Sequence, residues 1–228
     1  SATALKGITT GTTVTGDATY VSTITAGKNA VTITGGAAID TIYGSPKDDV
    51  ISTGGTATGD KVYAGAGNDT VTLTGSTDAM LAGATLDAGD GTADVLVLDT
   101  AGGATPFASA SFAKVSGFET LKLTGSGQYV VVLPANEGFT KAITGVGQTS
   151  ITSTDALSID GAALTSTLTL AGAGNISATV GSAATQFLGS AAAGDLTLTG
   201  GAGIVTMTGG SGSDVLNAAA STTAATIT

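Results

Sequence analysis

Four aspartates recur at a fixed place in a nine-residue pattern, and their type and spacing suit the binding of a metal ion. Read from Gly35, the sequence divides into nonapeptides 35–43, 44–52, 55–63 and 64–72, with two extra residues after the second. The sixth residue of each nonapeptide is an aspartate: Asp40, Asp49, Asp60 and Asp69. The eighth is a large aliphatic residue: Ile42, Ile51, Val62 and Val71.

The glycine- and aspartate-rich first part of each nonapeptide favours a turn, and the remaining part is long enough for a short strand. Two nonapeptides would form one coil with two inward aliphatic side chains, and such coils must stack to bury them. Asp40 and Asp60 then fall on one edge of the stack, and Asp49 and Asp69 fall on the other. Tyr43 and Tyr63 share the ninth position, which predicts a stacked pair on an outer face.

Stacked coils place like charges at the strand spacing of about 4.8 Å, where carboxylates repel one another. A hard cation between successive turns would remove this repulsion, and calcium takes six to eight oxygen ligands such as carboxylates and turn carbonyls. The pattern therefore predicts several calcium ions. The alternative is that the aspartates only form turns and bind nothing.

The pattern loses its frame after residue 72. Steps of two nonapeptides from Asp60 and Asp69 predict further ligands at Asp78 and Asp87. Residues 89–97 form another nonapeptide, out of phase with Asp87, with Asp90 second and Asp94 sixth. Because Asp87, Asp90 and Asp94 are the densest acidic group in the chain, one or two calcium ions are predicted there, with a solvated acidic loop as the alternative.

The other segments carry weaker versions of the same pattern. Residues 1–34 keep the aliphatic positions without the acids, which predicts a β-roll start continuous with the acidic coils. Residues 118–228 alternate apolar and polar residues between glycines, which favours an irregular parallel β-helix over a sandwich. The strands are expected near 118–123, 129–133, 142–144, 150–152, 157–159, 168–170, 176–180, 196–198 and 205–207. Residues 209–217 restore the nonapeptide, with Asp214 sixth and Leu216 eighth.

Residues 100–117 break the pattern and predict one short helix that interrupts the solenoid. Thr105 would cap its N-terminus, Pro106 would lie in its first turn, and Gly117 would end it. A helical turn is also expected at residues 133–138. The predicted organisation is a β-roll over 1–99, a linker with the helix over 100–117, and an irregular β-helix over 118–228.

Composition excludes several classes of protein. The net charge is −10, and the seven basic residues are all lysines without a basic cluster, so nucleic acid is not an expected partner. The absence of His and Cys excludes a Ser-His-Asp triad, thiolate metal sites and cysteine nucleophiles. No pair of carboxylates outside the repeats suggests glycosidase chemistry, and no apolar run suggests a membrane span. We therefore expect a protein that is not an enzyme.

The nonapeptides resemble the calcium-binding repeat of RTX proteins, G-G-x-G-x-D-x-U-x, which winds into a parallel β-roll. The resemblance implies side-chain ligands at Asp40, Asp49, Asp60, Asp69, Asp94 and Asp214. It also implies carbonyl ligands at Gly36, Gly65, Gly67, Gly210 and Gly212. Ala38, Lys47 and Thr58 depart from the glycine expected at the fourth position.

The threonine-, alanine- and glycine-rich remainder resembles bacterial S-layer proteins of the RTX type, in phrases such as L-D-A-G-D-G-T-A-D-V-L and V-S-G-F-E-T-L-K-L-T. This likeness implies type I secretion, folding on calcium outside the cell, and self-assembly into a two-dimensional surface lattice. Lipopolysaccharide or another surface glycan would anchor the lattice through parts of the protein outside this chain, which we expect to be a fragment. A module of a large RTX adhesin and the calcium-binding tail of a secreted enzyme remain alternatives.

Overall fold

The structure, a computed structural model, describes residues 3–8, 13–55, 57–100, 104–124, 128–133, 138–143, 149–153, 155–161, 164, 167–182, 184, 186–204, 206–218 and 226–228. The chain forms two compact units. Unit 1 comprises residues 1–99 and 110–121, and unit 2 comprises residues 100–109 and 122–228. Both units are parallel β-solenoids, as the sequence pattern predicted, because each described strand pairs in parallel with the strand one coil away.

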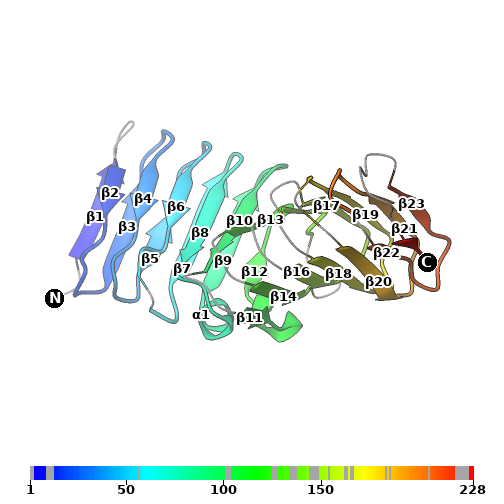
Figure 1. The fold of residues 1–228 in the computed structure, drawn as a ribbon. Helices are drawn as coiled ribbons and strands as arrows, with labels where there is room; N and C mark the ends of the chain where they lie inside the picture. Colours follow the sequence, from blue (N-terminus) through cyan, green and yellow to red (C-terminus); the bar gives the residue numbers. More distant parts are fainter. Residues whose placement is uncertain are drawn as a thin grey trace. The chain divides into compact units, whose positions relative to one another are not determined.

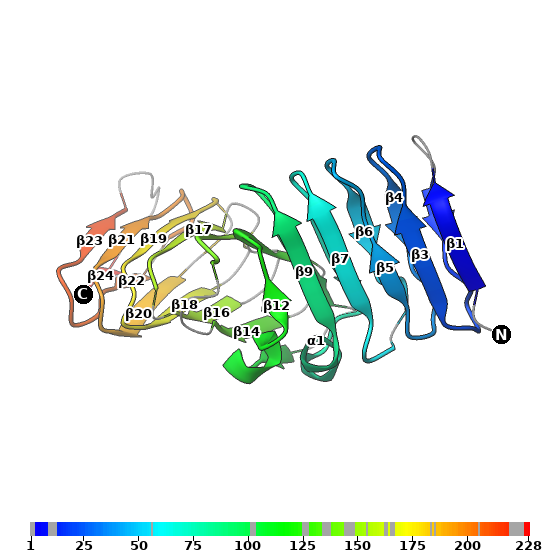
Figure 2. The ribbon, with the colours of Figure 1, turned by 180° about the vertical axis from the view of Figure 1, so that it is seen from behind.

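Each coil of unit 1 passes through two sheets in turn (Figure 1). The first sheet, seen from its own side in Figure 2, has the order β1 (Thr3–Ile8), β3 (Ser22–Ala26), β5 (Thr41–Tyr43), β7 (Lys61–Ala66), β9 (Thr85–Asp90) and β12 (Val115–Ser116). The second contains β2 (Thr13–Thr15), β4 (Thr32–Thr34), β6 (Val50–Ser52), β8 (Thr70–Thr74) and β10 (Val95–Asp99). Strand β13 (Thr120–Thr124) crosses the boundary between the units.

The aliphatic eighth positions and the aliphatic residues in register with them form the core of unit 1. Ile24, Ile42, Val62 and Leu86 stand in register on the first sheet, and Ile33, Ile51, Val71 and Leu96 on the second. All eight are at most 1% exposed. Their burial supplies the hydrophobic free energy that holds successive coils together, at roughly 25 cal/mol per Å² of apolar surface. The predicted continuity of residues 1–34 with the acidic coils is confirmed for the strands described there, since β1 and β2 pair in parallel with β3 and β4, which continue the register.

The outer face of the first sheet carries the predicted aromatic pair. Tyr43 pairs in register with Tyr63, and their rings stack with centroids 5.2 Å apart and planes 11° apart. Each ring therefore covers one face of the other, and Tyr43 remains 42% exposed. Asp87 follows Tyr63 in the same outward row and accepts a hydrogen bond from the hydroxyl of Ser116 at 3.0 Å.

A short helix, α1 (Asp78–Gly83), lies between β8 and β9. Alanine, methionine and leucine favour helix, and the Thr77 hydroxyl caps its start by accepting a hydrogen bond from the backbone N–H of Met80 at 3.2 Å. Met80 and Leu81 are buried. The prediction that Asp78 continues a column of turn aspartates is therefore wrong, because Asp78 begins this helix.

Replacing Thr77 with alanine should destabilise unit 1 by about 1 kcal/mol, because it removes the only side-chain acceptor at the helix start that the structure describes. The urea midpoint of the purified protein would measure the loss. Thr77→Ser keeps the hydroxyl and serves as the control. Equal losses in the two variants would show that the cap does not stabilise α1.

Unit 2 repeats the two-sheet arrangement. Its first sheet has the order β11 (Ala104–Phe107), β14 (Gln128–Val132), β16 (Thr149–Thr152), β18 (Thr167–Gly172), β20 (Gln186–Ala192), β22 (Thr206–Thr208) and β24 (Thr226–Ile227). Its second contains β15 (Lys141–Ile143), β17 (Leu157–Gly161), β19 (Ile176–Val180), β21 (Leu196–Thr199) and β23 (Val215–Asn217). The parallel pairing confirms a β-helix rather than a sandwich for residues 118–228.

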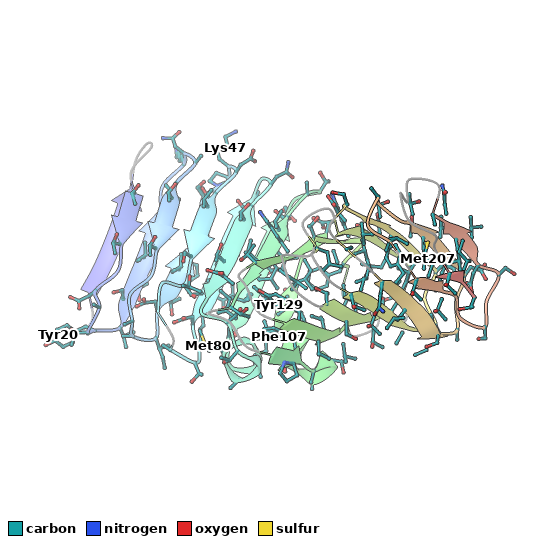
Figure 3. The ribbon with its side chains drawn as sticks, viewed as in Figure 1. Tyr20, Lys47, Met80, Phe107, Tyr129 and Met207 are labelled. Atoms are coloured by element: carbon teal, nitrogen blue, oxygen red, sulfur yellow. The ribbon has the colours of Figure 1, made fainter. Side chains whose placement is uncertain are left out.

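The core of unit 2 contains larger side chains than the aliphatic rows of unit 1. Phe107, Tyr129, Phe187 and Met207 are buried, and Figure 3 labels three of them among the strands of this unit. The Tyr129 hydroxyl donates to the carbonyl of Thr124 and accepts a hydrogen bond from Thr100 at 2.9 Å. By contrast, the labelled Lys47 of unit 1 projects outward from a turn.

The helix predicted from Thr105 to Gly117 is largely wrong. Thr105 and Pro106 belong to β11, where Pro106 stands opposite Val130, and only a short 3-10 helix, η1 (Ser109–Phe112), follows. Strand β11 is at the edge of its sheet, the position where a proline costs least because no further strand needs its missing N–H. The predicted linker over 100–117 is divided between the two units.

Some predictions fall partly or wholly outside the described residues. The helical turn expected at 133–138 includes residues 134–137, which lie outside the described residues. Thr144 and Val205, each part of an expected strand, also lie outside them. Strand β20 was not predicted, because Gly189 and the alanines obscure its alternation. Among the described residues, no helix is long and apolar enough to cross a bilayer.

Candidate metal centre

The sixth-position aspartates of unit 1 line the inside of the turns in two columns. Asp40, Asp49, Asp60 and Asp69 are each at most 1% exposed. In the first column, the N–H of Ser22 donates to Asp40 Oδ1 at 2.7 Å, and the N–H of Asp40 donates to Asp60 Oδ1 at 2.8 Å. Each carboxylate therefore accepts the N–H at the same position of the preceding coil.

The second column is longer than the sequence pattern predicted. The N–H of Val31 donates to Asp49, that of Asp49 to Asp69, that of Asp69 to Asp94 and that of Asp94 to Glu119, at 2.8, 2.7, 2.6 and 2.8 Å. Asp94, rather than Asp87, therefore follows Asp69 in the column. The prediction that Asp87 continues the column is wrong, because α1 makes this coil longer than two nonapeptides.

The second carboxylate oxygen divides the aspartates into two classes. In Asp40 and Asp49 it accepts a hydrogen bond from the N–H four residues earlier, that of Gly36 at 2.6 Å and that of Ser45 at 2.5 Å. In Asp60, Asp69 and Asp94 the Oδ2 atom is buried without a hydrogen-bond partner. A buried carboxylate oxygen without a donor is costly, and coordination to a cation would remove that cost for this second class.

The cause of this difference can be followed in the turns of the second column. Gly65 and Asp90 stand four residues before Asp69 and Asp94, but they lie inside β7 and β9, where they pair with Gly89 and Ala66. By contrast, Gly36 and Ser45 precede Asp40 and Asp49 in turns outside the strands. In these longer strands the backbone of Gly65 and of Asp90 takes part in strand pairing, so it does not donate to Oδ2.

The charges near the second class are all of one sign. Burial raises the pKa of Asp60 and of Asp69 to about 6, and the pKa of Asp94 is also raised, chiefly by burial. Backbone N–H donors oppose the increase, and neighbouring carboxylates add to it: Asp40 for Asp60, Asp49 and Asp94 for Asp69, and Glu119 for Asp94. Every charged group that perturbs these three pKa values is an acid.

Backbone carbonyls approach the same carboxylates. A Cβ atom added to Gly91 would lie 2.3 Å from Asp94 Oδ2 and 2.4 Å from the carbonyl oxygen of Gly67. The two oxygens therefore lie close to each other beside residue 91, where only a glycine fits. Carboxylate and carbonyl oxygens are the ligands that calcium prefers, so Asp60, Asp69, Asp94 and the turn carbonyls fit this ion.

The predicted acidic cluster is not assembled. Asp87 is half-buried on the outer face of β9, and Asp90 is exposed at the end of that strand, whereas Asp94 lies inside the turn. Among the residues that the structure describes, no three acidic side chains converge so that they could hold one metal ion. Each site would therefore combine few carboxylates with several carbonyls.

Asp214 in unit 2 belongs to the first class, in which both carboxylate oxygens have donors. Its Oδ1 accepts the N–H of Leu196 at 2.9 Å, and its Oδ2 accepts the N–H of Gly210 at 2.7 Å. Next to it is a more exposed row of hydrogen bonds. In this row the N–H of Asp195 donates to Asn175 Oδ1, and the N–H of Ser213 donates to Asp195 Oδ1. Asp214 therefore accepts a backbone N–H of the preceding coil, although the residue at the corresponding position of that coil is Leu196 and not an acid.

The five glycines predicted as carbonyl ligands lie where successive coils come close together. An added Cβ would be 1.8 Å from the Asp17 carbonyl at Gly36, 2.2 Å from that of Ser45 at Gly65, and 2.1 Å from that of Ala192 at Gly210. Gly67 and Gly212 are similarly close to backbone atoms of the neighbouring coil. Any larger residue would push the turns apart, so these glycines are required for stacking; their role as ligands remains a prediction.

Glu119 is the functional candidate that the sequence pattern missed. It follows Asp94 at the same sequence distance as Asp94 follows Asp69, and Leu121 takes the place of the eighth-position aliphatic after it. This spacing was the available signal. It is easily missed because 25 residues exceed two nonapeptides and because glutamate replaces aspartate.

Comparison with protein families finds the RTX calcium-binding nonapeptide repeat. The family model matches residues 34–57, 54–84 and 193–221. The chain therefore carries RTX repeats in both units, and these repeats are known calcium binders, which supports calcium as the ion. Comparison with curated proteins and with solved structures finds no match.

Proposed function

We propose that this chain is a calcium-folded structural module of a bacterial cell-surface layer, in which calcium rigidifies the solenoid and the module associates with itself into a two-dimensional lattice. The observation that carries the calcium role is the set of buried, unpartnered Oδ2 atoms of Asp60, Asp69 and Asp94. When bound, calcium supplies the positive charge that the surrounding acids lack. The matched RTX repeats support the same ion.

The lattice role is supported by composition and by the outer faces of the solenoid. The resemblance to RTX-type S-layer proteins covers the threonine-, alanine- and glycine-rich segments, and it supports a location outside the cell. Large apolar side chains such as Val50 and Val130 are 51% and 43% exposed on outer strand faces. We further propose a role without catalysis, since the sequence has neither His nor Cys.

A calcium titration with reversal by a chelator tests this proposal. Circular dichroism would follow folding, and sedimentation of the same sample would follow assembly. A gain of β-signal together with large ordered particles is the expected result. Folding without assembly would instead fit an adhesin module or the tail of a secreted enzyme, and no response to calcium would contradict the calcium role itself.

A further inference from the structure

The outer face of the first sheet in unit 1 carries exposed apolar side chains. Residues five, seven and nine of each nonapeptide point outward there, because side chains alternate along an extended chain and the sixth and eighth are buried. Val21, Ile39 and Tyr43 hold such outward positions and are between 42% and 49% exposed. Ile39 also extends toward the next coil, where a Cβ atom added to Gly59 would lie 3.6 Å from its Cδ1 atom. Apolar side chains gathered on one exposed face are typical of an interaction surface.

Two neighbouring rows of outward side chains differ in size. They cross strands β3, β5, β7 and β9, which lie side by side toward the viewer in Figure 2. The ninth-position row contains the stacked Tyr43 and Tyr63, and we call it the tyrosine row. The seventh-position row beside it contains the shorter Thr23 and Thr41 and then Lys61, and we call it the threonine row.

A row of large side chains beside a row of small ones can fit a second copy of itself. A two-fold axis parallel to the stacking direction of the coils exchanges the two rows between the copies. The tyrosine row of each copy then packs on the threonine row of the other, as side chains of two facing sheets interdigitate in aligned packing. Aromatic side chains are also enriched at the centre of protein interfaces.

The charges on this face favour a second copy as its occupant. From β3 to β9 the two rows contain two charged side chains, Lys61 and Asp87, and these have opposite signs. The exposed acids Asp48 and Asp90 lie instead in a turn and at the end of β9. Because the chain has a net charge of −10, two copies meet at the lowest electrostatic cost through a face without net charge.

The same two-fold axis brings the opposite charges together. Lys61 stands beside Tyr63 in register, so in the exchanged rows it faces Tyr63 of the second copy. Asp87 follows Tyr63 in the tyrosine row, one strand spacing of about 4.8 Å away, which a lysine side chain can span. The hydroxyl of Ser116 donates to Asp87 Oδ1, which leaves Oδ2 for the lysine. The symmetry makes this charge pair twice.

We propose that the first-sheet face of unit 1 is a two-fold interface with a second copy of this chain. The tyrosine row of each copy packs on the threonine row of the other, and Lys61 of each copy pairs with Asp87 of the other. This inference rests on the self-association in the proposed function and identifies the surface that carries it.

The test is sedimentation velocity of the full chain in calcium chloride, with charge reversals at the two paired positions. We expect Lys61→Glu and Asp87→Lys each to weaken association roughly tenfold or more, because like charges then face each other. The double variant restores the pair in the opposite sense and should associate as the wild type does. Tyr43→Ser should also weaken association roughly tenfold, because it truncates the exposed aromatic anchor.

Lys47→Glu is the matched control for the charge reversals. It changes the net charge as Lys61→Glu does, but Lys47 projects from a turn away from the two rows. The control should therefore associate as the wild type does. An equal loss in Lys47→Glu and Lys61→Glu would show that net charge, and not this face, controls association, and it would overturn the interface.

The other outcomes separate the possible failures. A wild-type chain that folds with calcium but stays monomeric would overturn the proposed self-association and would assign this face to a different partner. Wild-type association that Lys61→Glu and Tyr43→Ser leave unchanged would overturn only this interface, and so would a double variant that stays as weak as the single ones. Circular dichroism in calcium identifies a folding defect, and the charge reversals decide the matter if Tyr43→Ser does not fold.

Discussion

Replacing Asp69 with alanine is expected to destabilise unit 1 by several kcal/mol when calcium is present. The substitution leaves the buried N–H of Asp49 without its acceptor, a loss of roughly 1–3 kcal/mol. It also removes an oxygen that fits calcium, and a bound ion at a hundred times its Kd stabilises a fold by about 2.7 kcal/mol. Both losses follow from removing the same carboxylate, so together they amount to several kcal/mol.

Hydrogen exchange would locate this effect. Amides in residues 44–97 should exchange faster in Asp69→Ala than in the wild type, whereas amides in 140–199 should change little because they belong to unit 2. Asp90→Ala is the matched control, since Asp90 is an exposed acid at the end of β9 outside the column. Equal acceleration in both units would contradict a local role for the Asp69 carboxylate.

Without calcium, the fold is expected to be more stable near pH 5 than near pH 7.5. The pKa of Asp60 and of Asp69 is raised from 3.8 to about 6, chiefly by burial. A carboxyl with a raised folded-state pKa holds its proton more tightly in the folded state. Metal-free stability therefore falls as the pH rises from about 4 to 6, by at most roughly 3 kcal/mol per carboxyl.

Calcium should reverse this dependence, because the ion binds the ionised carboxylate. Urea unfolding of calcium-stripped and calcium-loaded protein at the two pH values would measure both slopes. The double variant with Asp60→Asn and Asp69→Asn is the control and should lose most of the pH dependence of the metal-free protein. Metal-free protein that is equally stable at both pH values would refute the prediction.

Much of the fold could be predicted because its determinants are local and periodic. An inward aliphatic residue once per short strand, as in Ile42 and Val62, is enough to specify a stacked coil when glycines allow the turns to approach. The buried rows of unit 1 confirm this reasoning. The same reasoning placed the sixth-position aspartates in turns, in two columns on opposite edges of the stack.

The errors arose where one coil has a different length from its neighbours. The segment T-D-A-M-L-A-G has a threonine cap and helix-forming residues, yet fixed steps of two nonapeptides made Asp78 a turn residue. The same helix displaced the column from Asp87 to Asp94. Pro106 suggested a helix start, but a proline is also compatible with an edge strand, and tertiary pairing with Val130 decided between the two.

The division of the aspartates into two classes could not be read from the sequence. Asp49 and Asp69 occupy the same position of similar nonapeptides, but only the Asp49 turn leaves a backbone N–H free to donate to Oδ2. The difference depends on how far β7 and β9 extend into their turns, which is set by pairing between coils. Local propensity does not determine that length.

The hydrogen bonds of the columns have a direction. In every described step the acceptor carboxylate belongs to the later coil and the donor N–H to the earlier one. The acids of one coil thus accept N–H groups of the coil before it, and the N–H groups of that coil donate to acids that follow in the chain. The consequence for mutational scans is a one-sided footprint of the column acids: losing one of them frees an N–H in the coil toward the N-terminus, whereas losing Asp48 or Asp195 frees an N–H in the coil toward the C-terminus.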